Sequence, residues 1–216
     1  ELMRMLERRR LLQTLGGLML GVLCAVSPGS SATATASEAS SDFVKSLGDQ
    51  AIKVLTVKDI SEGEREHRFR SLLRDGFDVR RIGRFVLGRY ARSASAEAIK
   101  QYNQLFEDLI VVTYASRFSQ YSGQSFDIKR ATKPTARGDS IVLSEIVATD
   151  GSPPIRVDWQ VNNAKGRYKI VDVRVEGVSM SVTQREEFTA VIRQNGGDIE
   201  ALLDALRKKT VSLKSK

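Results

Sequence analysis

The amino-acid sequence predicts an α+β fold, in which a curved antiparallel sheet of four strands carries helices on one of its faces. Hydrophobic residues recur at helical spacing up to Tyr121 and again after Glu176, and at a spacing of two between these residues. The connections between the predicted strands are short, which favours an antiparallel meander. A curved sheet under helices can enclose an apolar cavity.

Helical spacing of apolar residues defines six segments. Asp78 and Ser95 precede two of them, and their side-chain oxygens are suited to cap the first helical turn. The segment that follows Ser95 is apolar over more than half of its circumference, so we expect this helix to lie at the centre of the protein. The predicted helices cover residues 41–56, 62–77, 79–87, 95–120, 183–194 and 198–209.

Alternation of apolar and polar residues defines four strands, over residues 125–132, 140–149, 155–162 and 168–176. Two of these strands have an apolar face formed by every second residue, which suits a hydrophobic core. On the third strand these residues are Ile155, Val157, Trp159 and Val161. On the fourth strand simple alternation gives Val171, Val173 and Val175.

The first forty residues have the pattern of a targeting segment. Three arginines at positions 8–10 precede an apolar run over residues 11–26, and a stretch of small residues follows. This order is typical of a secretory signal peptide. We therefore predict a signal peptide over residues 1–36, a single domain over residues 37–210 and a basic tail over residues 211–216.

Charge and composition limit the possible functions. The 216 residues have a formal net charge of +8, and removal of residues 1–36 takes away four arginines and two glutamates, which leaves +6. The chain has one cysteine and one histidine, which excludes an internal disulfide, a cysteine-based zinc site and a histidine-rich metal site. An export signal without a second long apolar segment predicts a protein that is soluble outside the cytoplasm.

Candidate catalytic groups are few. His67 lies in a charged helical segment, where a solvated position is expected. Asp158 and Asp172 lie on neighbouring predicted strands, opposite the valines, where two carboxylates could form an acid–base pair. Such residues more often pair with a basic side chain, here Arg156 or Arg174, on a solvated face. We therefore predict no catalytic residue and no metal site.

The highest density of charge lies in segment 80–92, where aromatic residues alternate with five arginines. One interpretation is a solvated basic face, and the other is a docking patch for an acidic partner or for anionic lipid headgroups. The charge would also suit a nucleic acid, but the export signal argues against this partner. The predicted docking residues are Arg80, Arg81, Arg84 and Arg89.

Two stretches carry a family resemblance. The first comprises Phe77-Asp78-Val79, Gly83-Arg84-Phe85-Val86-Leu87-Gly88-Arg89-Tyr90, Leu105-Phe106-Glu107-Asp108-Leu109-Ile110 and Thr113-Tyr114-Ala115-Ser116-Arg117-Phe118. The second comprises Val157-Asp158-Trp159-Gln160, Lys169-Ile170-Val171-Asp172-Val173 and Glu176-Gly177-Val178-Ser179-Met180. In order and spacing they resemble the MlaC family of periplasmic lipid carriers, the toluene-tolerance auxiliary components of ABC transporters, over roughly residues 43–206. The arginine-rich segment departs from the family and leaves a hopanoid-associated branch open.

The resemblance implies a function without covalent chemistry and without a cofactor. The chain would be a monomeric carrier that shuttles phospholipid between an outer-membrane lipoprotein–porin complex and an inner-membrane ABC transporter, and so maintains outer-membrane lipid asymmetry. The acyl chains would be buried between the sheet and the helices. On the sheet side the expected lining is Val157, Trp159, Val171, Val173, Val175 and Val178. On the helix side it is Phe77, Ile82, Phe85, Val86, Leu105, Leu109 and Val112.

Two other functions fit the same pattern. Helices folded over a curved antiparallel sheet also describe the NTF2-like group, which includes small isomerases and hydrolases. In that case Asp158 or Asp172 would act as a general base inside the cavity, which requires the carboxylates to face it. The third possibility is a structural periplasmic adaptor that uses the arginine-rich face alone.

Overall fold

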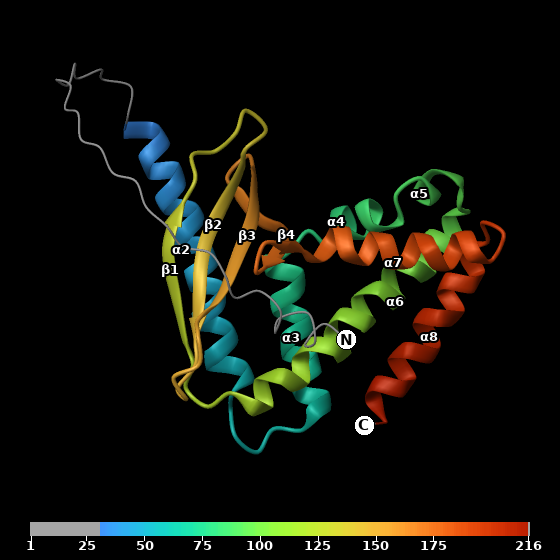
Figure 1. Ribbon diagram of the computed structural model, residues 1–216, viewed down its shortest axis with the longest axis horizontal. Helices are drawn as coiled ribbons and strands as arrows, with labels where there is room; N and C mark the ends of the chain where they lie inside the picture. The colour runs from blue at the N-terminus through green and yellow to red at the C-terminus, as the bar shows by residue number, and fades with distance from the viewer. Residues whose placement is uncertain (1–30, 216) are drawn as a thin grey trace, which may run out of the picture. The chain divides into compact units, whose positions relative to one another are not determined.

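The computed structural model of the protein describes residues 31–215 (Figure 1). Most of the predicted signal peptide, residues 1–36, lies outside the described residues. Residues 31–36 form the first part of helix α2, which spans Ser31–Leu55. The predicted basic tail begins inside the last helix, α8, which spans Ile199–Lys214.

The six predicted helices are present, but α2 begins ten residues earlier and α8 ends five residues later than predicted. Asp78 Oδ1 accepts a hydrogen bond from Arg81 N at 3.0 Å, and Ser95 Oγ accepts one from Ala98 N at 3.1 Å, so both predicted caps are confirmed. The long central helix ends at Ala115, and a 3₁₀ turn, η1, continues over Ser116–Gln120. This central helix is α6 (Ala96–Ala115). The remaining helices are α3 (Glu62–Gly76), α4 (Val79–Leu87), α5 (Tyr90–Ser93) and α7 (Met180–Gln194).

The strands form one antiparallel meander in the order β1-β2-β3-β4-β5, which confirms the predicted fold class. A short fifth strand follows the four predicted ones and leads directly into α7. The strands are β1 (Ser125–Ala131), β2 (Asp139–Val147), β3 (Ile155–Ala164), β4 (Arg167–Val175) and β5 (Val178–Ser179).

The pairing of β3 with β4 contains a bulge that simple alternation does not reveal. Trp159 lies opposite Val173, but the next apolar residue of β3, Val161, lies opposite Ile170. Val171 is the extra residue at this irregularity. Simple alternation placed Val171, Val173 and Val175 on one face of β4. Because of the bulge, Ile170 takes the place of Val171 on the face that carries Val173 and Val175.

Helix α2 covers the apolar face of the sheet. Val44 of α2 packs with Val142, Val161 and Ile170 in a cluster that we call the sheet core, and all four side chains are buried. Half-buried side chains surround this cluster, among them Phe43, Leu47, Phe77, Phe126, Trp159 and Val173. Full burial of one such aliphatic side chain stabilises the fold by about 1.5–3 kcal/mol, so this face accounts for much of the attachment of α2.

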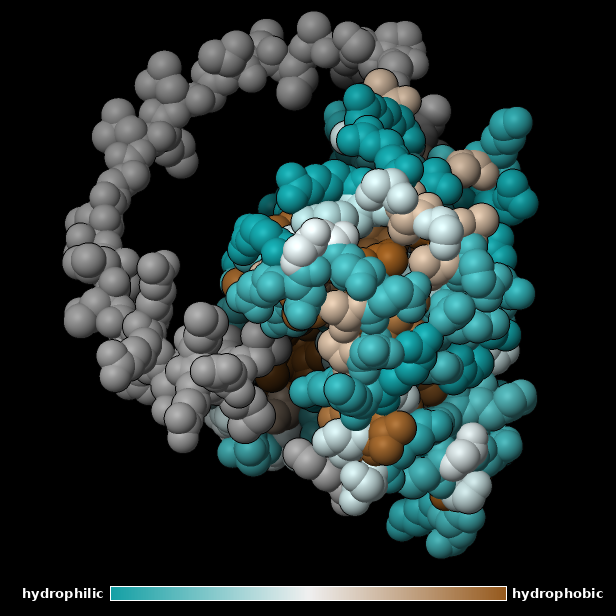
Figure 2. All heavy atoms as spheres, turned by 90° about the vertical axis from the view of Figure 1, so that its right-hand side faces the viewer, coloured by the Kyte–Doolittle hydropathy of each residue, from teal (hydrophilic) through white to brown (hydrophobic). Residues whose placement is uncertain are grey.

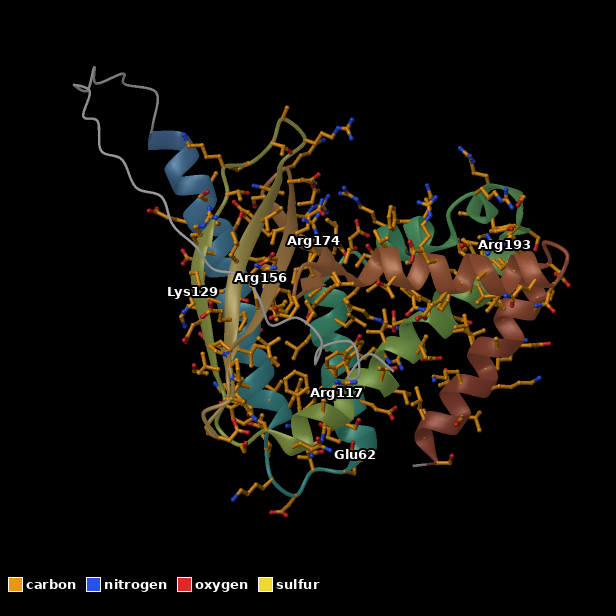
Figure 3. The ribbon with its side chains drawn as sticks, viewed as in Figure 1. Glu62, Arg117, Lys129, Arg156, Arg174 and Arg193 are labelled. Atoms are coloured by element: carbon orange, nitrogen blue, oxygen red, sulfur yellow. The ribbon has the colours of Figure 1, made fainter. Side chains whose placement is uncertain are left out.

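The opposite face of the sheet carries charged residues from β1, β3 and β4, whereas β2 adds the apolar residues Ile141 and Leu143 to it. Cross-strand register places Glu145 opposite Arg156 and Asp158 opposite Arg174, and Figure 3 labels both arginines on their strands. Lys129 Nζ lies 3.0 Å from Glu145 Oε2 on the same sheet. The alternation of apolar and charged residues predicted for β3 is thus confirmed.

A second, all-helical core lies beside the β4 edge of the sheet (Figure 1). Tyr102 and Phe106 of α6 stack with their ring centroids 5.5 Å apart, and Phe188 of α7 meets both ring systems edge-on. The predicted central position of α6 is therefore confirmed. The buried members of this helical core are Val86, Leu87, Tyr90, Ala98, Tyr102, Phe106, Leu109, Phe188, Ile192, Leu202, Leu203 and Leu206.

Two arginines of α3 form hydrogen bonds with the C-terminal end of α2. Arg65 is buried and donates to the carbonyl of Leu55, and Arg68 Nη1 donates to Val54 O at 3.1 Å. These carbonyls belong to the last turn of α2, where a positive charge is favourable. Helix α3 thus fixes the end of α2 by charge as well as by packing.

Candidate functional site

The residues predicted to line a lipid pocket are distributed over both cores. Phe77, Trp159 and Val173 belong to the periphery of the sheet core. Ile82, Val86, Leu105 and Leu109 belong to the helical core or its periphery. Val112, Val157 and Val171 are buried, Val175 is half-buried, and Phe85 and Val178 are exposed. That these thirteen residues line one pocket stays a prediction.

The segment between α3 and α4 brings the two cores together. Phe77 forms a parallel bridge with Ile170 of β4, and Asp78 N donates to Ile170 O at 3.0 Å. Phe77 packs on the sheet core, whereas Ile82, which follows one helical turn after Asp78, packs on the helical core. The α3–α4 segment therefore contacts both the sheet core and the helical core.

The apolar face of the sheet contains polar atoms that are already satisfied. Trp159 Nε1 donates to Ser144 Oγ at 2.9 Å, and Ser144 Oγ donates to Val157 O at 2.7 Å. The Trp159 ring also meets the Phe126 ring edge-on, with centroids 5.8 Å apart. Because its partners fix the indole, Trp159 offers an apolar surface that requires no further hydrogen bond.

The candidate carboxylates have structural partners. Asp172 is buried, and its Oδ2 and Oδ1 accept hydrogen bonds from Ser179 Oγ at 2.7 Å and Ser181 N at 3.1 Å. Ser179 Oγ in turn accepts from Val182 N in the first turn of α7. Asp172 thus secures the start of α7. This role depends on residues of the following turn, which the sequence pattern did not identify.

Asp158 and Asp172 do not lie directly opposite each other. The register pairs Asp158 with Arg174 and Asp172 with Gln160. Asp158 Oδ1 is buried and has no hydrogen-bond partner among the described residues, and His67 is exposed on α3. Residues 31–215 contain no group of three or more histidine, cysteine, aspartate or glutamate side chains that could hold a metal ion.

The four predicted docking arginines are exposed but have different surroundings. Arg80, Arg81, Arg84 and Arg89 are all exposed, and Arg81 Nη2 lies 3.7 Å from Asp139 Oδ1. Arg84 and Arg89 instead line a surface concavity of about 540 Å³. The other residues that line it are Phe85, Gly88, Ala91, Arg92 and Arg185. Arg185 is nearly one hundred residues away in sequence, so no local pattern could have placed it there.

Comparison with known proteins identifies the family. The family model described as MlaC protein matches residues 45–208. This chain belongs to the MlaC family. The match extends from α2 to the middle of α8 and so includes both cores.

Two relatives of known name are similar to part of this MlaC family member. One is the intermembrane phospholipid transport system binding protein MlaC of Haemophilus influenzae, 28% identical over 54% of this chain and 55% of the relative. The other is the toluene tolerance protein ttg2D of Pseudomonas putida, 21% identical over 54% of this chain and 53% of the relative. The matches thus span about half the length of each relative.

A solved structure shares the fold. The phospholipid-binding protein from Ralstonia solanacearum, determined in complex with a phospholipid, superposes with a TM-score of 0.71 and 21% sequence identity. The superposition covers 81% of this chain and 98% of the other. Within the described part of the chain no helix combines the length and the hydrophobicity that crossing a membrane requires.

The family resemblance seen in the sequence corresponds to a contact in space. The stretch that begins at Phe77 forms the α3–α4 junction, and the stretch 169–173 belongs to β4. The bond from Asp78 N to Ile170 O joins the two. The residues that resembled the MlaC family therefore include those that connect the sheet core to the helical core.

Proposed function

We propose that the chain is a periplasmic phospholipid carrier that shuttles lipid between the outer and the inner membrane. The observation that carries this proposal is the membership of the MlaC family over residues 45–208. The named relatives add support, since one is a phospholipid transport system binding protein and the structural neighbour was solved with a phospholipid. In this proposal the chain serves the maintenance of outer-membrane lipid asymmetry and is not an enzyme.

In the proposed mechanism the acyl chains lie between the apolar face of the sheet and the helices. The junction at Phe77, between the two cores, supports this location. Each buried methylene contributes about 0.8 kcal/mol, so two long chains would bind tightly and leave slowly. The headgroup would stay near the entrance, and contact with a partner would open the site for release.

The proposed partners are an outer-membrane lipoprotein–porin complex and an inner-membrane ABC transporter complex. The exposed arginines at positions 80, 81, 84 and 89 would dock on acidic surfaces. We further propose that the mature domain begins near Ser37, after removal of the signal peptide. The bond from Ser37 Oγ to Thr132 O, at 2.8 Å, supports this boundary because a chain that starts there retains an anchor of α2 on the sheet.

The experiment measures transfer of a fluorescent phospholipid between two vesicle populations by the purified mature protein. Wild-type protein should accelerate transfer in proportion to its concentration. The Val178→Glu variant tests the entrance, because Val178 is 51% exposed and a glutamate there need not disturb folding. If acyl chains pass this side chain, the unpaired carboxylate should reduce transfer by more than about tenfold.

A matched control is Val211→Glu, at a side chain of α8 that is 68% exposed. It should transfer lipid at the wild-type rate. Equal transfer by both variants, with unchanged melting temperatures, would remove Val178 from the site. Absence of transfer by the wild-type protein would contradict the carrier function itself.

A further inference from the structure

We propose that the concavity between α4, α5 and α7 is a binding site for a phosphate group, and that Phe85, predicted above to line the lipid pocket, belongs to this surface site. Four guanidinium groups line it, from Arg84, Arg89, Arg92 and Arg185, together with the Phe85 ring and Gly88. The proposal rests on the docking role given above for Arg84 and Arg89, and it names the chemistry that they recognise.

Arg185 is held in place without a carboxylate. Its guanidinium carbon lies 5.1 Å from the centroid of the Phe85 ring. On another side, a Cβ at Gly88 would lie only 3.1 Å from its Nε and Nη2. The guanidinium of Arg185 is thus close to the Phe85 ring and to the backbone of Gly88. A side chain at position 88 would crowd the guanidinium, and the φ of +57° at this position also favours glycine.

Arg89 is positioned by the residue that follows it. Arg89 Nη2 donates to Tyr90 Oη at 2.9 Å, and the Tyr90 hydroxyl belongs to a residue of the helical core. Across the described part of the chain, none of the four lining arginines forms an ion pair with a carboxylate. Four like charges around one hollow repel each other, and a bound anion would relieve that repulsion.

The number of guanidinium groups favours phosphate over a single carboxylate. A carboxylate offers two oxygens and one charge, which one arginine fork can satisfy, whereas a phosphate monoester offers three strongly accepting oxygens and up to two negative charges. The arginine fork matches this geometry. The volume of about 540 Å³ is that of a small-molecule site and leaves room for a substituent on the phosphate. The exposed Phe85 ring could contact such a substituent.

The phosphate has two possible sources, a soluble ester or a lipid headgroup at a membrane surface. The experiment titrates the full mature protein with inorganic phosphate, with glycerol phosphate, and with phosphatidylcholine vesicles that contain or lack phosphatidic acid, whose headgroup is a phosphate monoester. Binding is followed by the Nε–Hε resonances of the arginines in NMR spectra. Saturable shifts with the soluble phosphates indicate the first source, and shifts only with phosphatidic acid vesicles indicate the second. Either result supports the site.

The decisive comparison is between Arg185→Gln and Arg193→Gln. Both remove one charge from α7, but Arg193, labelled in Figure 3, does not line the concavity. Arg185→Gln should weaken binding by about tenfold or more, as expected for loss of a charge-assisted hydrogen bond, and Arg193→Gln should not. If Arg185→Gln does not fold, Arg92→Gln, at an exposed residue of α5, replaces it.

Two results would overturn the phosphate site. Equal weakening by both variants would mean that phosphate responds only to net charge. Binding of an acidic peptide at these arginines, with no response to any phosphate, would make the concavity a docking site for carboxylates. The lipid-transfer assay is independent of this titration, so failure of the phosphate site and failure of the carrier function can be distinguished.

Discussion

Glu107 of α6 is half-buried and joins α6 to α3 through a group of partly exposed charges. Its Oε1 lies 2.6 Å from Arg70 Nη1 and 2.8 Å from Arg74 Nη2, both on α3, and Arg70 also reaches Asp108 Oδ1 at 2.7 Å. Burial acts to raise the pKa of Glu107, but the hydrogen bonds and charges of Arg74 and Arg70 outweigh it, and the pKa is lowered. The adjacent carboxylates of residues 107 and 108, which point to different sides of a helix, thus share Arg70.

The lowered pKa of Glu107 predicts a pH dependence of folding. Because the pKa is lower in the folded state than in the unfolded state, its stabilising effect is complete above the unfolded value of about 4.3 and is lost as the pH falls through the folded value. Urea unfolding of the wild-type protein should therefore show a decreasing free energy of unfolding below about pH 5. In Glu107→Gln this part of the decrease should be absent, and stability at neutral pH should be lower.

Glu97→Gln provides the control for this experiment. Glu97 is exposed in the first turn of the same helix and has no ion-pair partner in the part of the chain that the structure describes. This variant should keep the wild-type pH profile. A Glu107→Gln profile that coincides with that of the wild-type protein would show that the contacts with Arg70 and Arg74 do not couple protonation to folding.

Single residues also mark the limit of sequence-based prediction. The caps Asp78 and Ser95 were predictable because a cap acts on its own helix within three residues. The role of Asp172 was not, because its partners lie beyond a turn, Ser179 in β5 and Ser181 in the first turn of α7. Arg185 joins the arginines of α4 and α5 only through the packing of α7. Contacts between distant segments leave no local signal.

The contact between α2 and the sheet depends on a glycine. A Cβ added at Gly48 would lie 2.6 Å from Phe126 Cδ1 on β1, and Phe126 packs on Trp159. The helix approaches the strand this closely only because no side chain intervenes. Substitution at Gly48 should therefore affect the position of both aromatic rings.

Gly48→Ala should destabilise the protein by about 1–3 kcal/mol, because the aromatic ring must shift to admit the methyl group. Trp159 is the single tryptophan of the chain, so its fluorescence should report the displacement directly. The matched control is Gly63→Ala in α3, where an added Cβ meets nothing within 4 Å. This control should increase stability by about 0.5 kcal/mol. A Gly48→Ala protein with wild-type stability and fluorescence would argue against the close packing of α2 on β1.

At the scale of elements, the order of helices and strands and most of their boundaries followed from periodicity, but α2 begins at Ser31 and α8 ends at Lys214, beyond the predicted ends. The other exceptions have physical reasons. The bulge at Val171 changes the register of β4, and a bulge need not alter the apolar pattern of its strand. Strand β5 is only two residues long, too short to show an alternation. Helix α5 spans four residues and forms a single turn, which no periodicity can reveal.

The whole molecule differs from the simplest picture of helices on one face of a sheet. Helix α2 covers the apolar face, whereas α4, α6, α7 and α8 form a core of their own beside β4 (Figure 1). The outer side of this helical body, near α5 and α8, is mostly hydrophilic, with small apolar patches (Figure 2). Hydrophobic pattern alone could not divide the buried residues between the two cores. It also could not separate a core from a pocket lining, because both consist mainly of apolar side chains.

The location of the cargo between these two cores is therefore the part of the proposal that most needs a test. Residues of both cores are predicted to line the same site, and they meet where Asp78 N binds Ile170 O. A carrier with tightly bound acyl chains should retain its lipid through purification, because each buried methylene slows its escape.

The most direct measurement is native mass spectrometry of the mature protein purified from a periplasmic extract, followed by extraction and identification of the lipid. We expect the mass of the native protein to exceed the mass of its polypeptide chain by the mass of a diacyl phospholipid. Denaturation should remove this extra mass. A hopanoid mass would contradict the phospholipid cargo. A protein that is free of lipid and takes up none from vesicles would contradict the central claim that this member of the MlaC family carries lipid.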